Sequence, residues 1–347
     1  MIHSAAASPS ASTLPNPQRL PGALSSYREP SAARSLTEIA VTLAPLVALW
    51  ASMWALSSVS YWLSLALSLP AAGFLVRTFM IQHDCGHGSF FRSRAVNDWV
   101  GRVLGVITLT PYDYWKRTHA AHHAGAGNLE RRGQGDIETL TVNEYLAKSW
   151  LGRLGYRLYR HPLVMFGLGP SYLFLVQHRI PLGLLSGAGW KPWLSAMFTN
   201  AGIAAVVALL MWLIGPWTFM MIHAPIFLLS ATAGIWLFYV QHQFEGADWA
   251  HDAEWSLPTA ALHGSSHYDL PVILRWFTAN IGVHHVHHLA SRIPFYRLRE
   301  VLHDFPELAD VSRLTLAQSL SCVRYALWDE DARKMIPFSA LRARASE

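Results

Sequence analysis

Three short clusters of histidine are the residues of this chain most suited to chemistry. The clusters read HDCGH at 83–87, HAAHH at 119–123 and HHVHH at 284–288. On a helix, side chains three or four positions apart share a face, so each cluster would present two or three imidazoles on one side. Neutral imidazole binds zinc, copper, iron or nickel. The spacing therefore predicts a metal site built from helix ends.

The number of imidazoles indicates more than one metal ion. Two clusters of three and one of two exceed the four ligands of a tetrahedral zinc site, and they suit two ions with open coordination positions. A separate histidine, His242, ends an apolar run and is a further candidate ligand. One such motif alone could arise by chance on a helix, but three beside apolar runs favour metal binding. The residues by themselves do not decide between iron and zinc.

The composition indicates that a membrane positions these clusters. The 347 residues are 52% hydrophobic and 14% charged, whereas soluble domains carry roughly a quarter of charged residues. Crossing a bilayer takes about 20 apolar residues. Four segments meet this requirement and are the predicted spans, at about 38–56, 61–82, 193–214 and 217–240. We therefore expect an all-α integral membrane protein with about four transmembrane helices and a cytosolic helical cap carrying the histidine-rich site.

The charges predict the orientation. The loops near Ser57 and Gly215 carry no Lys or Arg, and the segments 83–192 and 241–347 carry most of them. Under the positive-inside rule these two long segments are cytosolic, with both termini and all three clusters. The net charge of +5 includes no basic run with interleaved aromatics, so no nucleic-acid partner is expected.

Outside the spans, the sequence predicts three kinds of segment. Residues 1–35 are rich in Ala, Ser, Pro and Arg and lack an apolar secretory segment, so we expect a disordered tail before a membrane domain at 36–347. Residues 95–118 mix apolar and charged side chains, which is typical of a helix lying at the membrane interface. The apolar run 162–176 is too short to span and is broken by Gly169-Pro170. We expect it to insert only partly.

The motifs resemble those of the membrane fatty-acid desaturases, specifically the acyl-lipid omega-6 (delta-12) type. The resemblance runs from about residue 40 to the C-terminus. It is carried by HDCGHGSFF (83–91), TPYDYWKRTHAAHH (110–123), FYVQHQFE (238–245) and NIGVHHVHHL (280–289). These histidine motifs are highly specific for the superfamily and less specific for the position of the double bond.

The resemblance implies a diiron centre and its ligands. The implied ligands are His83, His87, His119, His122, His123, His242, His284, His287 and His288. Some relatives place an asparagine one helical turn before the isolated histidine, where it is linked to iron through water. Phe238 occupies that position here, so this role is either unfilled or taken by another residue.

The resemblance also implies the reaction and its partners. O2 is the co-substrate, two hydrogens leave neighbouring methylenes of a fatty-acyl lipid, and a cis double bond and water remain. Two external electrons are needed per turnover. Because the chain has no nucleotide-binding GxGxxG motif, no Cys-rich iron–sulfur pattern and no obvious fused haem domain, the expected donor is a separate ferredoxin or cytochrome b5-like protein.

Ligating histidines usually donate their second ring N–H to a carboxylate or carbonyl. Candidates for this supporting role are Asp84, Asp113, Asp136, Glu138, Glu245, Asp269, Asn280 and His285. The alternative for each carboxylate is an ordinary surface charge. Asp136 and Glu138 stand out because they follow the second cluster in a polar loop flanked by glycine.

Two other functions fit the same residues. An acyl hydroxylase, or a carotenoid hydroxylase or ketolase, would share the metal site but leave oxygen on the carbon. A membrane metal transporter or sensor would need polar residues within the spans. The spans carry few beyond Ser, Thr, Asn200 and His223, which disfavours transport.

Overall fold

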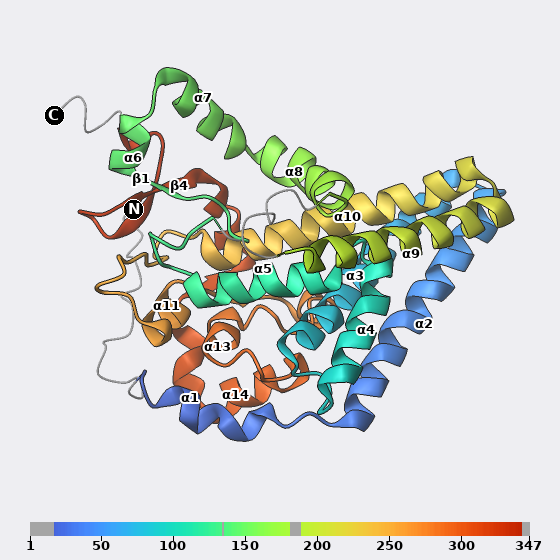
Figure 1. Cartoon of the computed structure of the whole chain (residues 1–347), viewed down its shortest axis with the longest axis horizontal. Helices are drawn as coiled ribbons and strands as arrows, with labels where there is room; N and C mark the ends of the chain where they lie inside the picture. The colour runs from blue at the N-terminus through green and yellow to red at the C-terminus, as the bar shows by residue number, and fades with distance from the viewer. Residues whose placement is uncertain (1–16, 134, 181–188, 342–347) are drawn as a thin grey trace.

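Four long apolar helices form the membrane part of the computed structural model, which describes residues 17–133, 135–180 and 189–341. They coincide with the four predicted spans, and each extends the predicted limits by a few residues at one end or both. Figure 1 shows the four helices meeting at one end of the molecule, with the rest of the chain gathered around the other. The helices are α2 (Ala32–Ser57), α3 (Tyr61–His87), α9 (Lys191–Ile214) and α10 (Pro216–His242).

Short turns join these helices in two antiparallel pairs. Three residues separate α2 from α3, and Gly215 alone separates α9 from α10. Gly215 has a φ of +85°, a conformation that glycine adopts without a steric penalty. The following Pro216 then starts α10 with its φ already suited to a helix.

Helices α3 and α10 are longer than a bilayer requires. Each has 27 residues, which at 1.5 Å per residue makes about 40 Å, whereas the hydrocarbon core is about 30 Å thick. Their last turns therefore continue beyond the apolar layer. Those turns carry His83, His87 and His242.

The cap is mostly helical. Between the two pairs of spans lie α4 (Arg94–Ile107), α5 (Tyr112–Gly125), α6 (Val142–Ala147), α7 (Trp150–Tyr159), the π-helical turns η2 (Val164–Leu168) and η3 (Leu173–Gln177), and α8 (Gly169–Tyr172). After α10 come α11 (Leu257–His263), α12 (Val272–Phe277), α13 (His284–Leu289), α14 (Leu298–Asp304), α15 (Leu316–Ser319) and the 3-10 turns η5 (Phe295–Arg297), η6 (Pro306–Asp310) and η7 (Cys322–Arg324).

Two small sheets, which the sequence did not predict, complete the cap. Strand β4 (Tyr325–Asp329) pairs in parallel with β1 (Leu140–Thr141) and antiparallel with β5 (Lys334–Pro337). Strand β2 (His267–Asp269) pairs in parallel with β3 (Arg313–Thr315). Strands of two to five residues are too short for an alternating apolar pattern to stand out in the sequence.

The expected interfacial helix at 95–118 is two helices. A turn at Thr108–Pro111, with Leu109 at a positive φ of 54°, separates α4 from α5. Helix α4 exposes one apolar face, formed by Val96, Trp99, Val103 and Ile107. That face matches an interfacial position. The partial insertion expected at 162–176 corresponds to η2, α8 and η3, and its depth in the bilayer stays a prediction.

The expectation of a disordered tail is wrong for residues 17–35. Leu20, in the short helix α1 (Leu20–Ala23), and Leu24, in the 3-10 turn η1 (Leu24–Arg28), are buried. The Tyr27 hydroxyl donates a hydrogen bond of 2.5 Å to Asp304. Two leucines and a tyrosine thus dock a segment whose average composition predicted disorder. Residues 1–16 of the expected tail lie outside the described residues.

Candidate metal centre

Four separate elements bring the nine histidines together. The end of α3 supplies two, α5 three, the end of α10 one and α13 three. Figure 1 shows α5 and α13 close together at the cap end of the long helices. Helix α3 stops just after His87 because Gly88 takes the left-handed conformation, with a φ of +68°, and its N–H bonds back to Cys85. This is a common glycine C-cap.

Five of the histidines form what we call the open group: His83, His87, His119, His123 and His287. His119 lies at its centre. The Nε2 atom of His119 is 3.0 Å from Nε2 of His83, 3.0 Å from Nε2 of His87 and 3.1 Å from Nε2 of His123. His287 completes the group, with its Nε2 atom 3.2 Å from that of His123.

The other four form the enclosed group: His122, His242, His284 and His288. The Nε2 atom of His242 is 3.2 Å from Nε2 of His122 and 3.0 Å from Nε2 of His284. The Nε2 atoms of His284 and His288 are 3.1 Å apart. In each group, all the potential ligand atoms lie within 4.8 Å of one another.

The protonation states fit metal ions at these two points. Burial, reinforced by the neighbouring imidazoles, holds the pKa values of His119, His123, His284, His287 and His288 well below the ordinary value of 6.5. The rings are therefore neutral near pH 7 and have lone pairs to offer. A neutral ring carries at most one proton on Nε2, so His119 could donate to only one of the three ring nitrogens around it. A metal cation, by contrast, can accept lone pairs from all of these nitrogens.

The two groups differ in their access to solvent. His87, His119 and His123 of the open group are partly exposed. All four members of the enclosed group are buried, and none exposes more than 7% of its surface. The open group takes its histidines from α3, α5 and α13, and the enclosed group takes its histidines from α5, α10 and α13.

Two hydrogen bonds orient rings of the enclosed group. His122 donates through Nδ1 to the buried carboxylate of Asp136, where the sequence analysis expected a supporting carboxylate. His242 Nδ1 lies 3.4 Å from the carbonyl oxygen of Gly264. Such contacts fix the ring and leave Nε2 facing the metal position.

The other supporting candidates lie elsewhere or only near the site. Asp84 comes closest, with Oδ1 3.4 Å from His83 Nδ1 and Oδ2 accepting 2.7 Å from the Phe295 N–H. The Glu138 side chain is exposed, and Asn280 donates to the Phe295 carbonyl at 3.3 Å. His285 donates through Nε2 to the Leu308 carbonyl at 2.8 Å. Burial lowers its pKa to about 3, so it is a neutral core residue.

The remaining three carboxylates bind partners outside the site. Asp113 accepts from Arg102 at 2.9 Å, Asp269 from Arg313 at 2.6 Å, and Glu245 from the Tyr325 hydroxyl at 3.0 Å. Each lies on the polar surface of the cap. The expectation that they support ligands is wrong, because their charges are used in ordinary surface contacts.

Two aromatic side chains touch the histidines: Phe238, whose position was noted from the sequence, and Trp115, which was not predicted there. Trp115 stacks on His119, with ring centroids 4.6 Å apart and an interplanar angle of 16°. A β-carbon at Gly86 would come within 2.7 Å of Cζ3 of Trp115, so only glycine leaves room for this indole. Phe238 lies 5.0 Å from the His122 ring and 5.2 Å from the His242 ring. Both aromatics precede a histidine of the site by four residues, which is the signal that could also have identified Trp115.

A buried arginine ties the Asp136 loop to the end of α10. Arg160 donates to Gln243 Oε1 at 2.7 Å and to the Glu138 carbonyl at 3.2 Å. Gln243 in turn donates to Thr139 Oγ1 at 3.0 Å. Burial of the cation opposes its charge, but contacts with neighbouring tyrosines outweigh this and raise the pKa of Arg160. The guanidinium therefore stays charged while it fixes the loop on which Asp136 lies.

Comparison with known proteins decides the family. The sequence model of the fatty acid desaturases matches residues 60–318. The chain belongs to the fatty acid desaturase family. The desaturase is 44% identical over 320 residues to "Fatty acid desaturase" of Bacillus subtilis (strain 168), across 92% of this chain and 90% of that relative.

More distant relatives carry more specific names. The desaturase is 30% identical over 235 residues to the "sn-1 acyl-lipid omega-3 desaturase (ferredoxin)" of Synechocystis, across 64% of this chain and 61% of the relative. It is 28% identical over 225 residues to the "sn-1 oleoyl-lipid 12-desaturase" of the same organism, across 65% and 63%. Family membership favours desaturation over hydroxylation or metal transport: the chain is an integral-membrane oxidoreductase that desaturates fatty acids with a histidine-rich di-metal site.

Proposed function

We propose that the desaturase holds two iron ions, one in each histidine group, and uses O2 to place a cis double bond in a membrane acyl lipid. The observation that carries the proposal is the convergence of nine Nε2 atoms on two points. Imidazole ligands accept several metals, but removing hydrogen from an unactivated methylene requires a redox-active one. Iron bound in this way would supply O2 activation and one-electron chemistry.

The residues of the chain have distinct parts in this proposal. All nine histidines are metal ligands: His83, His87, His119, His123 and His287 at one ion, and His122, His242, His284 and His288 at the other. Asp136 orients His122, and Asp84 contributes more weakly beside His83. Phe238 shields the enclosed group with an apolar ring where some relatives place asparagine.

The substrate and its bond position form the narrower part of the proposal. An acyl lipid fits a protein with four spans, because the substrate then lies in the same layer as the helices. The delta-12, or omega-6, position is favoured by the motif resemblance, and the relatives include both oleoyl-lipid 12-desaturases and omega-3 desaturases. The relative at 44% identity carries no bond position in its name.

The electrons come, in this proposal, from a separate protein such as a ferredoxin or a cytochrome b5-like carrier. Two relatives, from Synechocystis and Helianthus annuus, carry the word ferredoxin in their names. The loops at the far ends of the spans carry no Lys or Arg, which supports a cytosolic position for the metal centre and both termini in this proposal.

Expression in a host that lacks polyunsaturated lipids tests the proposal. The total fatty acids are profiled by gas chromatography and mass spectrometry, with derivatives that locate the double bond. We expect a product two mass units lighter than its precursor, and about two iron ions per purified chain. A product sixteen units heavier would indicate a hydroxylase, and a metal-free active protein would contradict the iron centre.

A further inference from the structure

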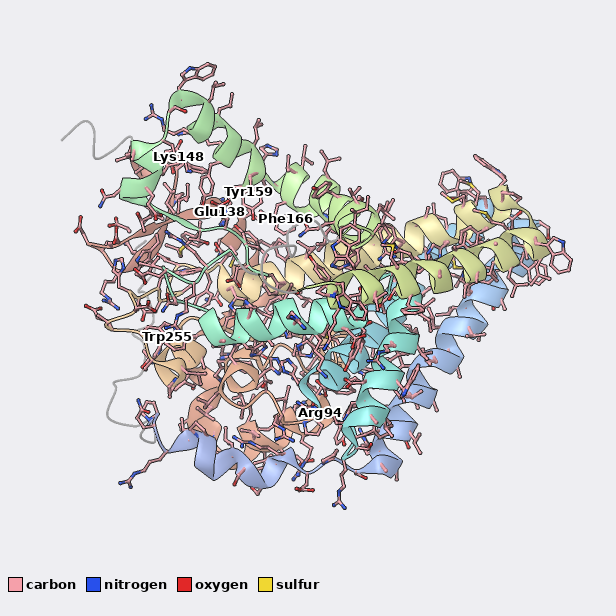
Figure 2. The ribbon with its side chains drawn as sticks, viewed as in Figure 1. Arg94, Glu138, Lys148, Tyr159, Phe166 and Trp255 are labelled. Atoms are coloured by element: carbon pink, nitrogen blue, oxygen red, sulfur yellow. The ribbon has the colours of Figure 1, made fainter. Side chains whose placement is uncertain are left out.

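A cavity of about 330 Å³ opens on the surface directly beside the open group. It is lined by His87, Gly88, Arg92, Arg94 and Arg292. These residues come from the end of α3, the turn after it, the start of α4 and the loop after α13. Figure 2 shows Arg94 at the start of α4.

The cavity carries an excess of positive charge. Arg92 lies 3.4 Å from Glu29, and both of these side chains are largely exposed, so the pair is weak. Within the described ranges, no carboxylate forms an ion pair with Arg94 or Arg292. Three guanidinium groups thus meet one carboxylate on this surface, which suits an anionic partner.

One imidazole separates the cavity from the metal position. His87 lines the cavity, and its Nε2 atom lies 3.0 Å from that of the central His119. The buried enclosed group contributes no residue to the lining. Because electron tunnelling weakens steeply with distance, a carrier seated here would be better placed than one docked over the enclosed group.

We infer that this arginine-lined cavity is the docking site of an acidic one-electron iron–sulfur protein; the inference rests on the function proposed above. A lipid phosphate is the other anion to consider. The reacting methylenes of a long acyl chain lie many bonds from the headgroup. If the phosphate were bound beside His87, these methylenes would therefore lie beyond the metal position rather than next to it. An electron carrier has the opposite requirement, since it must come as close to the ligands as possible.

The electron balance sets what the carrier delivers. The acyl chain loses two hydrogens, O2 is reduced to two water molecules, and two further electrons and two protons are consumed. Two reduced carriers are each oxidised by one electron per double bond. The same surface must therefore bind a carrier, release it and bind another, as expected for small electrostatic interfaces.

Charge reversal tests the docking site on the full chain in nanodiscs. The variant Arg92→Glu/Arg94→Glu/Arg292→Glu is compared with Lys148→Glu/Arg324→Glu/Lys334→Glu, which makes the same charge change elsewhere. Figure 2 shows Lys148 far from Arg94. Binding of a purified acidic [2Fe–2S] ferredoxin is measured by biolayer interferometry, and turnover is measured against ferredoxin concentration and with dithionite as a small reductant.

We expect the cavity variant to weaken ferredoxin binding and raise its KM about tenfold at low ionic strength, with less effect at high salt. Dithionite-driven turnover, iron content and the control variant should be unchanged. The milder Arg94→Gln/Arg292→Gln variant should show a smaller effect in the same direction, which separates charge loss from misfolding.

Unchanged ferredoxin binding and KM in the cavity variants would overturn the docking site. A raised KM for the lipid with unchanged ferredoxin binding would assign the cavity to a headgroup instead. If the unsubstituted chain desaturates nothing with either reductant, the proposed function fails. The binding comparison still gives its own answer, because it requires no turnover.

Discussion

The two histidine groups share one ligand chemistry but differ in their surroundings. The open group has five imidazoles, three of them partly exposed, and adjoins a cavity lined by arginine. The enclosed group has four buried imidazoles, one oriented by Asp136 and two contacted by Phe238. The contrast teaches that exposure, rather than side-chain type, distinguishes the two groups: the open group adjoins the surface and a cavity, and the enclosed group is shielded from water.

The largest expected effect comes from removing one ligand from either group. His122→Ala in the enclosed group and His287→Ala in the open group should each abolish the unsaturated product, because the reaction needs both ions. Fatty-acid profiling measures the product, and membrane fractionation shows that the protein is retained. His285→Gln is the matched control on α13, since glutamine can still donate to the Leu308 carbonyl, and it should keep most of the activity. Retained activity in His122→Ala or His287→Ala would remove that residue from the ligand set.

The next largest effect should come from Asp136, which contacts the enclosed group alone, and should therefore distinguish the two groups. Asp136→Asn removes the anionic acceptor of His122 Nδ1 and should lower metal affinity of the enclosed group by about 10- to 100-fold. At limiting iron, the content should fall from two ions per chain towards one, as measured by elemental analysis. Glu138→Gln, in the same loop but exposed, should leave the content at two. An equal loss of iron from the Asp136→Asn and Glu138→Gln variants would show that Asp136 acts by stabilising the loop rather than by orienting His122.

Acid should weaken the metal-free protein through both groups. Burial lowers the pKa values of His119 and His123 in the open group and of His284 and His288 in the enclosed group. Below about pH 6.5 these histidines bind protons in the unfolded chain but stay neutral in the folded chain. The free energy of unfolding therefore falls as the pH drops through that value. Above about pH 7.5 these groups are neutral in both states and contribute no pH dependence.

Thermal unfolding of the metal-free protein in detergent, followed between pH 7.5 and 5, measures this effect. His288→Gln removes one of these imidazoles and should flatten the decline. A melting temperature that stays constant across the range would contradict the neutral, buried state of the rings.

The smallest expected effect concerns the apolar lining of the enclosed group. Phe238→Leu keeps an apolar side chain against His122 and His242 but fills less space. We expect a loss of about 1 kcal/mol in the free energy of unfolding and a decrease in product within a few-fold. Denaturant unfolding and fatty-acid profiling measure the two. A complete loss of product would show that the ring has a role beyond excluding water.

Much of the architecture was predictable because its signals are local. Apolar runs long enough to cross a bilayer marked the four spans, and the spacing of HAAHH and HHVHH predicted which rings share a helix face. The carboxylate of Asp136 was predictable because it follows the second cluster closely. The histidine that Asp136 contacts could not be predicted from sequence, because the conformation of the loop decides which imidazole ring the carboxylate reaches.

The misses were decided by tertiary contacts. Asp84 adjoins His83 in sequence, yet its stronger contact is the Phe295 N–H, 211 residues away. His285 lies among three histidines of the two groups, but its helical position turns it towards the Leu308 carbonyl. Leu20 and Leu24 are buried because the cap offers them a surface, which the composition of the tail does not reveal. Strands β1 and β4, and likewise β2 and β3, pair across more than 40 residues of chain, beyond the reach of local patterns.

The space beside Gly86 has a consequence for how this sequence can evolve. Any β-carbon there would press on Trp115, and the indole would take the stacked His119 with it. Homologues that replace this glycine should therefore carry a smaller residue at the tryptophan position, and a saturation library should tolerate few single changes there. The glycine, although it has no side chain, thus restricts the residues allowed at two other positions, those of Trp115 and His119.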